Sequence, residues 1–112
     1  MSAPRLNRAL LLEALQRVPD GAGGYRDTWA TVGRLWAEVR PGAGRVVAAD
    51  PVTVSVASCR ITVRAAPAGA PSRPRPDQRF REGARTFRIL AVAEADAEGR
   101  FLTCFAAEEV AA

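Results

Sequence analysis

The sequence predicts an all-β protein whose strands close into a small barrel. Two runs, Arg79 to Val92 and Phe101 to Phe105, alternate apolar and polar residues, and an acidic turn containing glycine separates them. A second turn, Pro19 to Gly24, is rich in residues that favour positive φ and tight reversal. Nine glycines and eight prolines among 112 residues indicate many further turns. The predicted fold is therefore all-β, and one short helix is left open.

The open segment is Arg5 to Val18, which fits both a helix and a strand. Leu11, Leu15 and Val18 recur at helical spacing, yet the segment leads directly into the glycine-rich turn, as the first strand of a hairpin would. The periodicity of so short a run does not decide between the two. Residues 1 to about 7 are expected to form an N-terminal arm.

Beyond the glycine-rich turn, Tyr25 to Val32 and Leu35 to Arg40 are predicted strands, with a bulge or kink at Gly33 between them. Trp, Thr, Val and Tyr are enriched in strands, and Pro41-Gly42 ends the second run. In that run one face carries Leu35, Ala37 and Val39, and the other carries Trp36, Glu38 and Arg40.

The middle of the chain is predicted to hold a connection followed by a long strand. Residues 43–51 are the expected connection, and Val52 to Val63 is the longest alternating stretch. Its apolar residues change parity: Val52, Val54 and Val56 share one parity, and Cys59, Ile61 and Val63 share the other. A bulge or break at Ala57-Ser58 would keep both sets on the core side.

The last third begins with a long loop. Residues 65–78 contain four prolines and no amphipathic period, so we expect an extended loop with polyproline-like stiffness. A charged corner at Glu82-Gly83 and the acidic turn at 93–100 then separate the final strands. The aromatic residues placed in the core by default are Trp29, Trp36, Phe80, Phe87, Phe101 and Phe105.

Length and charge bound the class of protein. A chain of 112 residues corresponds to about one domain, here residues 1–112. All sixteen basic residues are arginine, and twelve carboxylates leave a formal charge of +4 with a pI near 10.4. This balance permits an acidic partner such as a nucleic-acid backbone, because arginine pairs bidentately with phosphate. A high-GC genome would produce the same composition without any such partner.

The cysteines and apolar runs indicate an intracellular protein without a membrane partner. Cys59 and Cys104 are far apart and each lies in a strand-like run, where lone thiols behave as small buried hydrophobes. They fit neither a paired Cys-x-x-Cys motif nor a disulfide framework. Leu10 to Leu12 is too short for a signal peptide or membrane span, and Glu13 interrupts it. A reducing cytoplasm is the expected site of synthesis.

Catalysis is not expected. With no histidine and no lysine, a Ser-His-Asp triad, most zinc sites and Schiff-base chemistry are excluded. The carboxylates Glu94, Asp96 and Glu98 lie in a predicted turn, and Glu108-Glu109 lies at the chain terminus. Neither set has the partners of a buried acid–base pair, so both are interpreted as solvated. No cofactor and no metal are expected.

Two groups of residues are candidate contact sites. The first consists of Arg73, Arg75, Arg79 and Arg81, which the stiff loop and the following strand present to DNA or a neighbouring subunit. Phe80 is the only aromatic residue close to these arginines, so base stacking is not expected. The second group is Trp36, Glu38 and Arg40, a strand face that could meet another subunit. A solvated surface loop is the alternative interpretation of the first group, and a place in the core is the alternative for Trp36.

The order of these elements resembles the tailed-phage head-tail joining family, the head-closure or stopper proteins. The residues that carry the resemblance are Asp20 to Tyr25, Thr28-Trp29, Leu35 to Val39, Arg60 to Arg64, Phe80 to Gly83, Thr86 to Leu90 and Phe101 to Phe105. The resemblance covers about Leu6 to Val110, and no single motif in it is specific. The arginine- and alanine-rich composition is most similar to the version carried by gene transfer agents of α-proteobacteria.

The resemblance implies a structural subunit without catalytic residues. Copies would form a six- or twelve-fold ring around the DNA channel, between the portal and adaptor rings and the tail terminator, in the neck of a particle assembled in the bacterial cytoplasm. Such a ring retains packaged DNA and docks the tail, and double-stranded DNA passes through it without base-specific contacts. The alternative is a free-standing small barrel that binds nucleic acid. An enzymatic role remains open only for a subunit that borrows catalytic residues from a partner.

Overall fold

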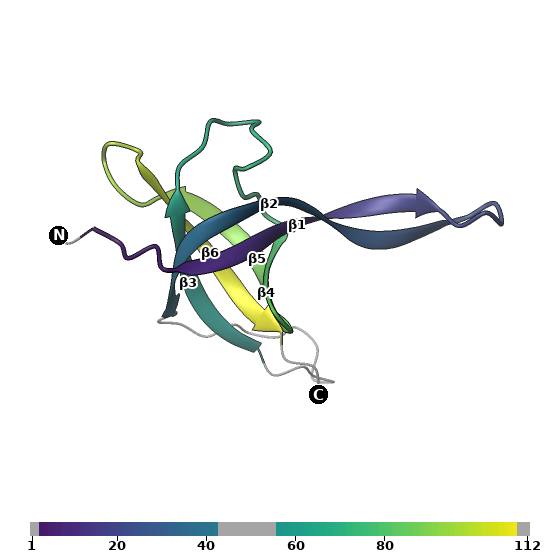
Figure 1. The fold of residues 1–112 in the computed structure, drawn as a ribbon, viewed down its shortest axis with the longest axis horizontal. Helices are drawn as coiled ribbons and strands as arrows, with labels where there is room; N and C mark the ends of the chain where they lie inside the picture. The colour runs from purple at the N-terminus through teal and green to yellow at the C-terminus, as the bar shows by residue number, and fades with distance from the viewer. Residues whose placement is uncertain (1–2, 43–55, 110–112) are drawn as a thin grey trace.

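The computed structural model describes residues 3–42 and 56–109, and six antiparallel strands in these ranges close into a barrel (Figure 1). The strands are β1 (Arg8–Pro19), β2 (Tyr25–Pro41), β3 (Val56–Arg64), β4 (Arg79–Glu82), β5 (Arg85–Glu94) and β6 (Phe101–Glu109). Their order around the barrel is β1-β2-β3-β6-β5-β4, and β4 pairs back onto β1. The all-β prediction is confirmed, and none of the described residues forms a helix, let alone one long and apolar enough to cross a membrane.

The ambiguous N-terminal segment is a strand. β1 pairs with β2 along its whole length, and its even-numbered residues Leu10 and Leu12 are fully buried in the barrel. The residues at helical spacing do not form a core face, since Leu15 is 52% exposed. Three consecutive leucines satisfy either period locally, so pairing with β2 and β4 decides the conformation.

The predicted hairpin turn joins β1 to β2. Asp20 organises it, because its backbone N–H bonds Gly24 O at 3.1 Å and its Oδ1 accepts the N–H groups of Ala22 and Gly24 at 2.8 and 3.0 Å. Gly21 and Gly23 have φ angles of 81° and 85°, which residues with a Cβ rarely adopt. The sequence pattern therefore has a direct conformational cause.

The predicted bulge is present beside Gly33. Leu12 pairs with Gly33 while Glu13 pairs with Thr31, so Val32 is the extra residue of β2. The extra residue changes the parity of β2, and Trp29 and Trp36 consequently both lie on the outer face of the sheet. The default placement of all aromatic residues in the core is wrong for Trp29, Trp36 and Phe105, which are 36%, 57% and 38% exposed.

The core fills the barrel with one inward-facing residue set from each strand. Phe80 and Phe87 are its largest members and are fully buried, as predicted. Cys59 and Cys104 are buried and unpaired, also as predicted, and the Cys59 thiol lies 3.7 Å from the carbonyl oxygen of Ala106. The remaining buried members are Leu10, Leu12, Ala37, Ile61, Val63, Ile89, Leu102 and Ala106.

One detail of the predicted third strand is wrong. β3 pairs with β6 in a single unbroken register from Val56 to Arg64, so no bulge interrupts this pairing at Ala57-Ser58. Cys59, Ile61 and Val63 of β3 face the core, and the carbonyl oxygen of Ser58 accepts the backbone N–H of Gly42 at 2.9 Å. The expected connection at 43–51 and the expected strand start at 52–55 lie outside the described residues.

A two-stranded ribbon projects from the barrel (Figure 1). β1 pairs with β4 only as far as Glu13, and β2 pairs with β3 only from Ala37 onward. Residues 14–30, which we call the hairpin arm, therefore pair only with each other and extend to one end of a molecule measuring 54 × 34 × 23 Å. At the opposite end lie the segment that precedes β1 and the turn between β5 and β6.

Candidate functional site

The proline loop, residues 65–78, is a loop as predicted, and it is ordered by its own hydrogen bonds. The backbone N–H groups of Ala70 and Arg73 bond the carbonyl groups three residues earlier, each at 3.0 Å. Gln78 is buried and its Oε1 accepts the backbone N–H of Arg75 at 2.9 Å. Pro74 is fully buried beneath the loop. The loop is thus a folded surface element held together by contacts among its own residues.

The two loop arginines have different roles. Arg73 is half-buried, and its Nη1 donates to the carbonyl oxygen of Ala66 at 2.8 Å, which closes the loop on itself. Arg75 is exposed, and among the described residues no carboxylate pairs with its guanidinium. Arg75 is consequently the loop cation that is available for an external anion.

Arg79 and Arg81 converge on a buried carboxylate that the sequence analysis did not pair with them. Pairing of β1 with β4 places Glu13 opposite Arg79, with Arg81 on the same outer face. Arg79 Nε donates to one carboxylate oxygen of Glu13 at 2.7 Å, and Arg81 Nε donates to the other at 2.9 Å. The Glu13 side chain is only 5% exposed. We call these three residues the Glu13 clamp, and its formal charge is +1.

The clamp sets the ionisation of Glu13 and involves an aromatic ring. Burial raises the pKa of Glu13, but the hydrogen bonds and charges of Arg79 and Arg81 outweigh this effect and hold the pKa below its ordinary value. The guanidinium carbon of Arg79 also lies 4.1 Å from the centre of the Trp29 ring, a cation–π distance. The expected neighbour, Phe80, points into the core instead, so Trp29 is the aromatic residue beside these arginines.

The second candidate group lies together on the outer face of β2. Trp36 is 57% exposed and stacks with Arg34, whose guanidinium carbon is 6.0 Å from the ring centre. Glu38 is engaged within the chain: it accepts the Arg5 backbone N–H at 2.8 Å and pairs with Arg40 at 2.9 Å. Trp36 and Arg40, whose side chain is 67% exposed, are thus the members with free surface, and the place of this group at an interface stays a prediction.

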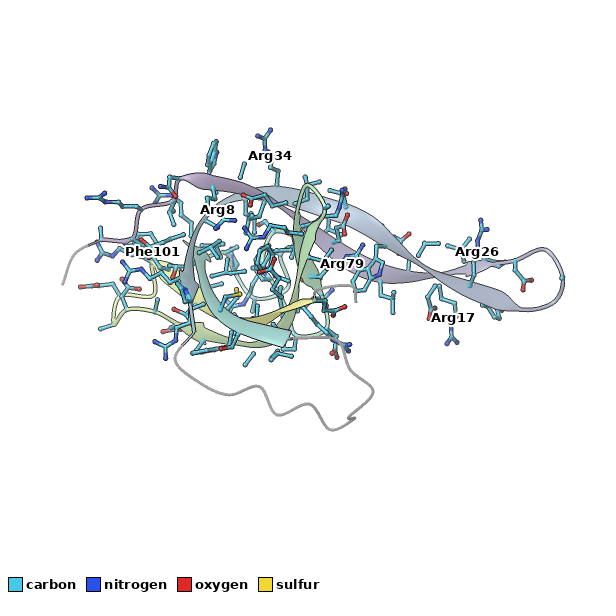
Figure 2. All side chains as sticks on the ribbon, turned by 90° about the horizontal axis from the view of Figure 1, so that it is seen from below. Arg8, Arg17, Arg26, Arg34, Arg79 and Phe101 are labelled. Atoms are coloured by element: carbon cyan, nitrogen blue, oxygen red, sulfur yellow. The ribbon has the colours of Figure 1, made fainter. Side chains whose placement is uncertain are left out.

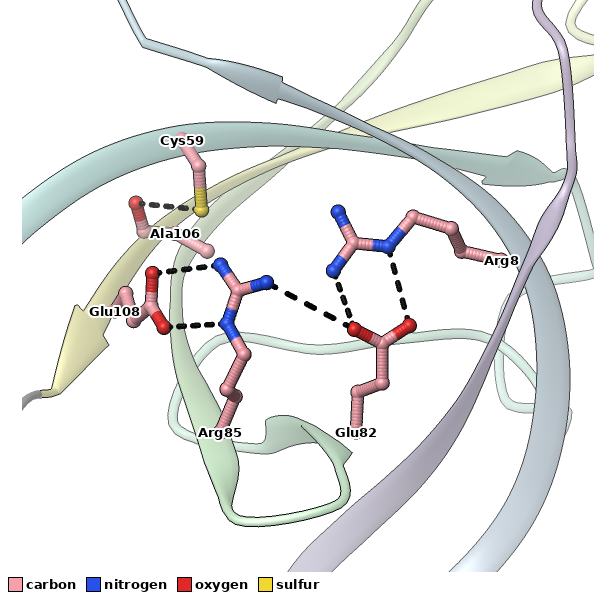
Figure 3. A network of polar contacts seen from close by, with 6 residues as sticks. All are labelled: Arg8, Cys59, Glu82, Arg85, Ala106 and Glu108. Atoms are coloured by element: carbon pink, nitrogen blue, oxygen red, sulfur yellow. Dashed lines mark hydrogen bonds and ion pairs between the residues drawn. The ribbon is translucent and has the colours of Figure 1, made fainter.

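Four charged residues close one end of the barrel in a network that sequence reasoning missed (Figure 3). Arg8 pairs bidentately with Glu82: its Nε donates to Oε2 at 3.1 Å, and its Nη2 donates to Oε1. Arg85 pairs bidentately with Glu108 at 2.7 and 2.9 Å and approaches Glu82 at 3.9 Å. A pocket of about 250 Å³ beside them reaches Cys59. We call this set the barrel-end network.

The two arginines of the barrel-end network stabilise the ionised form of its two glutamates. The hydrogen bond from Arg8 lowers the pKa of Glu82, and the hydrogen bond from Arg85 lowers the pKa of Glu108. The interpretation of Glu108 as a solvated terminal acid is therefore wrong. The sequence did contain a signal, since Arg8 shares the parity of the buried Leu10 and so points inward.

The thiols and carboxylates of the described residues are not arranged as a metal site or as an activated nucleophile. Within residues 3–42 and 56–109, no group of three or more Cys, Asp or Glu side chains is placed to hold a metal ion. Burial raises the pKa of Cys59 to about 11 and that of Cys104 to about 12, so neither thiol is an activated nucleophile.

The acidic turn between β5 and β6 is held by Asp96, because its Oδ1 accepts the backbone N–H groups of Arg100 and Phe101.

The chain matches one protein family and one solved structure. Residues 1–109 match the family described as phage head completion protein. A solved structure titled "Virion of native gene transfer agent (GTA) particle" contains a similar chain, with 60% sequence identity, a TM-score of 0.78, and coverage of 98% of this chain and 100% of that one. A comparison with curated proteins finds no match.

Proposed function

The chain belongs to the phage head completion protein family, and on that premise we propose that it is a structural subunit of the head-tail connector of a phage-like particle. The observation that carries the proposal is the 60% identity to a virion chain over nearly the full length of both chains. Identity of that extent preserves surfaces as well as the core, so a shared place in a particle is the simplest explanation.

In this role copies of the chain form a ring around the DNA channel, with the portal and adaptor on the head side and the tail terminator on the tail side. The ring retains packaged DNA and offers a docking surface to the tail. It assembles in the bacterial cytoplasm and stays in the neck of the particle. The subunit performs no catalysis, and its contribution is mechanical.

Among the candidate DNA contacts, Arg75 is the leading one because it is exposed and has no carboxylate partner in the described chain. Arg79 and Arg81 each give one donor to Glu13, but a guanidinium has five N–H donors, so both retain capacity for phosphate. Arg73 supports the loop that carries Arg75. Contacts of this kind would be independent of base sequence and weakened by salt.

The alternative, a free-standing barrel that binds nucleic acid, needs exposed aromatic platforms. Trp29 lies beside the arginines, but Arg79 already occupies one face of its ring. Purified protein that binds DNA with a steep salt dependence, together with particles that lack the chain, would favour this alternative.

The proposal is tested by cryo-electron microscopy of particles from a strain that expresses a tagged copy. Density for the chain between head and tail is the expected result. DNA retention is then compared between Arg75→Ala and the control Arg88→Ala, which removes the same charge from an exposed position on β5. We expect DNA loss in the first variant alone; full retention would remove Arg75 from the mechanism.

A further inference from the structure

The hairpin arm is an incomplete structure in a single copy of the chain. Both of its outer strand edges lack a partner strand in the described chain, from residue 14 to 19 on β1 and from residue 25 to 30 on β2. An isolated two-stranded ribbon is marginally stable in water, and open edges are templates for association. The arm is therefore expected to be completed by something outside its own subunit.

The arm ends in side chains that favour a protein interface. Tyr25 is 65% exposed, and the guanidinium carbon of Arg17 lies 5.7 Å from the centre of its ring. The register of the hairpin puts these two residues on one face with Leu15, which is 52% exposed. Tyr and Arg are the residues most enriched at energetically dominant contacts, and here the stacking holds them in place before binding.

A pocket of complementary character lies at the opposite end of the molecule. Its volume is about 510 Å³, and the segment before β1, the outer faces of β2 and β3, and the turn between β5 and β6 surround it. Pro4, Ala95, Ala97 and Phe101 supply apolar lining. The charged lining consists of three carboxylates, on Glu38, Asp96 and Glu98, and of the two arginines that pair with them, Arg40 and Arg100. Figure 2 shows Phe101 at one end of the long axis and Arg17 near the other.

Each end carries an exposed charge of opposite sign whose ion pair within the chain is long. The pocket lining holds three carboxylates and two arginines, and the arm holds two arginines and two aspartates, so neither end is strongly charged as a whole. Glu98 is 68% exposed, and its ion pair with Arg100 spans 3.3 Å. On the arm, Arg17 is 72% exposed and its nearest carboxylate, on Asp27, is 3.9 Å away. An exposed arginine such as Arg17 on a neighbouring copy would be attracted to the exposed carboxylate of Glu98.

We propose that the tip of the hairpin arm of one copy, led by Tyr25 and Arg17, docks into this pocket of the next copy. The inference rests on the proposed function, since it names the contact that joins subunits of the ring. The arm tip and the pocket lie at opposite ends of the long axis, so the contact between two copies is head-to-tail. Head-to-tail contacts form a closed ring when the rotation from one copy to the next divides a full turn evenly. The tip of each arm is then covered by its neighbour.

The test is site-directed cross-linking in assembled particles with a tagged full-length chain. Ala22→Cys places a thiol at the tip and Ala97→Cys places one at the pocket, both at exposed positions. Cys59 and Cys104 are buried with raised pKa values and do not compete for a bismaleimide reagent. The control pairs Ala22→Cys with Ala84→Cys, an exposed position in the turn between β4 and β5.

The expected result is a ladder of covalent dimers and higher multimers from the tip–pocket pair and none from the control pair. Arg17→Glu should reduce the ladder about tenfold, and Glu98→Arg in the same chain should restore it, because every interface then regains opposite charges. Tyr25→Ala should reduce the ladder without such rescue.

The outcomes separate this inference from the function on which it rests. Particles that contain the tagged chain but yield cross-links from the tip only to other proteins, or none at all, would overturn the docking of arm into pocket and leave the connector role standing. Particles that lack the tagged chain would contradict the connector role itself. Equal ladders from the tip–pocket and control pairs would also overturn the inference, since contact would then be unspecific.

Discussion

Replacing Glu13 by Gln is expected to destabilise the protein by about 2 kcal/mol, although Glu13 lies on the outer face of the barrel. Its side chain is 5% exposed and receives two charge-assisted hydrogen bonds, at 2.7 and 2.9 Å. Removing one partner of a fully buried ion pair costs about 3–5 kcal/mol. Arg79 and Arg81 are 24% and 38% exposed, so water compensates part of the loss, and we expect about 2 kcal/mol, which is below that range.

The effect should depend on pH with a defined sign. The folded-state pKa of Glu13 lies below its unfolded value, which is about 4.3 for a model glutamate. Its contribution is therefore fully present above the unfolded pKa and disappears as the pH falls through the lowered folded pKa. The stability difference between wild type and Glu13→Gln should be constant near pH 7 and shrink in acid below about pH 4.

The assay is urea unfolding of purified full-length protein at pH 7 and at decreasing pH. Asp27→Asn is the matched control, because Asp27 is 56% exposed and its ion pair with Arg17 spans 3.9 Å. An exposed pair of this kind contributes at most about 1 kcal/mol. If Glu13→Gln and Asp27→Asn unfold at the same urea concentration, the argument from burial and convergent arginines is refuted.

Two further predictions concern the backbone and the thiols. Gly83→Ala should lower the free energy of unfolding by about 1 kcal/mol, because Gly83 has a φ of 59°. Gly33→Ala should leave the stability unchanged or raise it slightly, because Gly33 has no positive φ and has open space around it. Equal changes in melting temperature for the two variants would contradict this prediction. Cys59 and Cys104 should resist a maleimide at pH 8 in the folded protein and react fully in denaturant, because burial raises their pKa values to about 11 and 12. Rapid labelling of the native protein would show that the barrel opens readily.

Local features of the sequence predict most of the strands and turns. The turn at residues 20–24 and the bulge beside Gly33 follow from backbone preferences that act over a few residues. The N-terminal strand does not, because its leucine run satisfies two periods and the decision comes from pairing with β4, more than sixty residues away. The expectation that Trp29 lies in the core fails for a related reason, because the extra residue Val32 in β2 changes the face of the sheet on which Trp29 lies.

The sequence predicts the grouping of the four candidate arginines but not their partners. The sequence places Arg73, Arg75, Arg79 and Arg81 near one another, yet only the β1–β4 pairing brings the last two onto Glu13. Eight of the sixteen arginines form ion pairs within the described chain: Arg8, Arg17, Arg40, Arg79, Arg81, Arg85, Arg88 and Arg100. A basic pI therefore overstates the positive charge that is available to a partner.

The short pairing between β1 and β4 also sets the order in which the chain can fold. It joins only Leu11, Leu12 and Glu13 to their partners, and the arginines on Glu13 are 66 and 68 positions away in sequence. The hairpin of β1 and β2 needs only a five-residue turn. Contacts between distant residues carry the larger loop-closure entropy and form late. We expect a nascent chain to form its projecting hairpin first and to close its barrel last; pulse-labelling exchange that protects residues 79–81 before residues 25–30 would contradict that order.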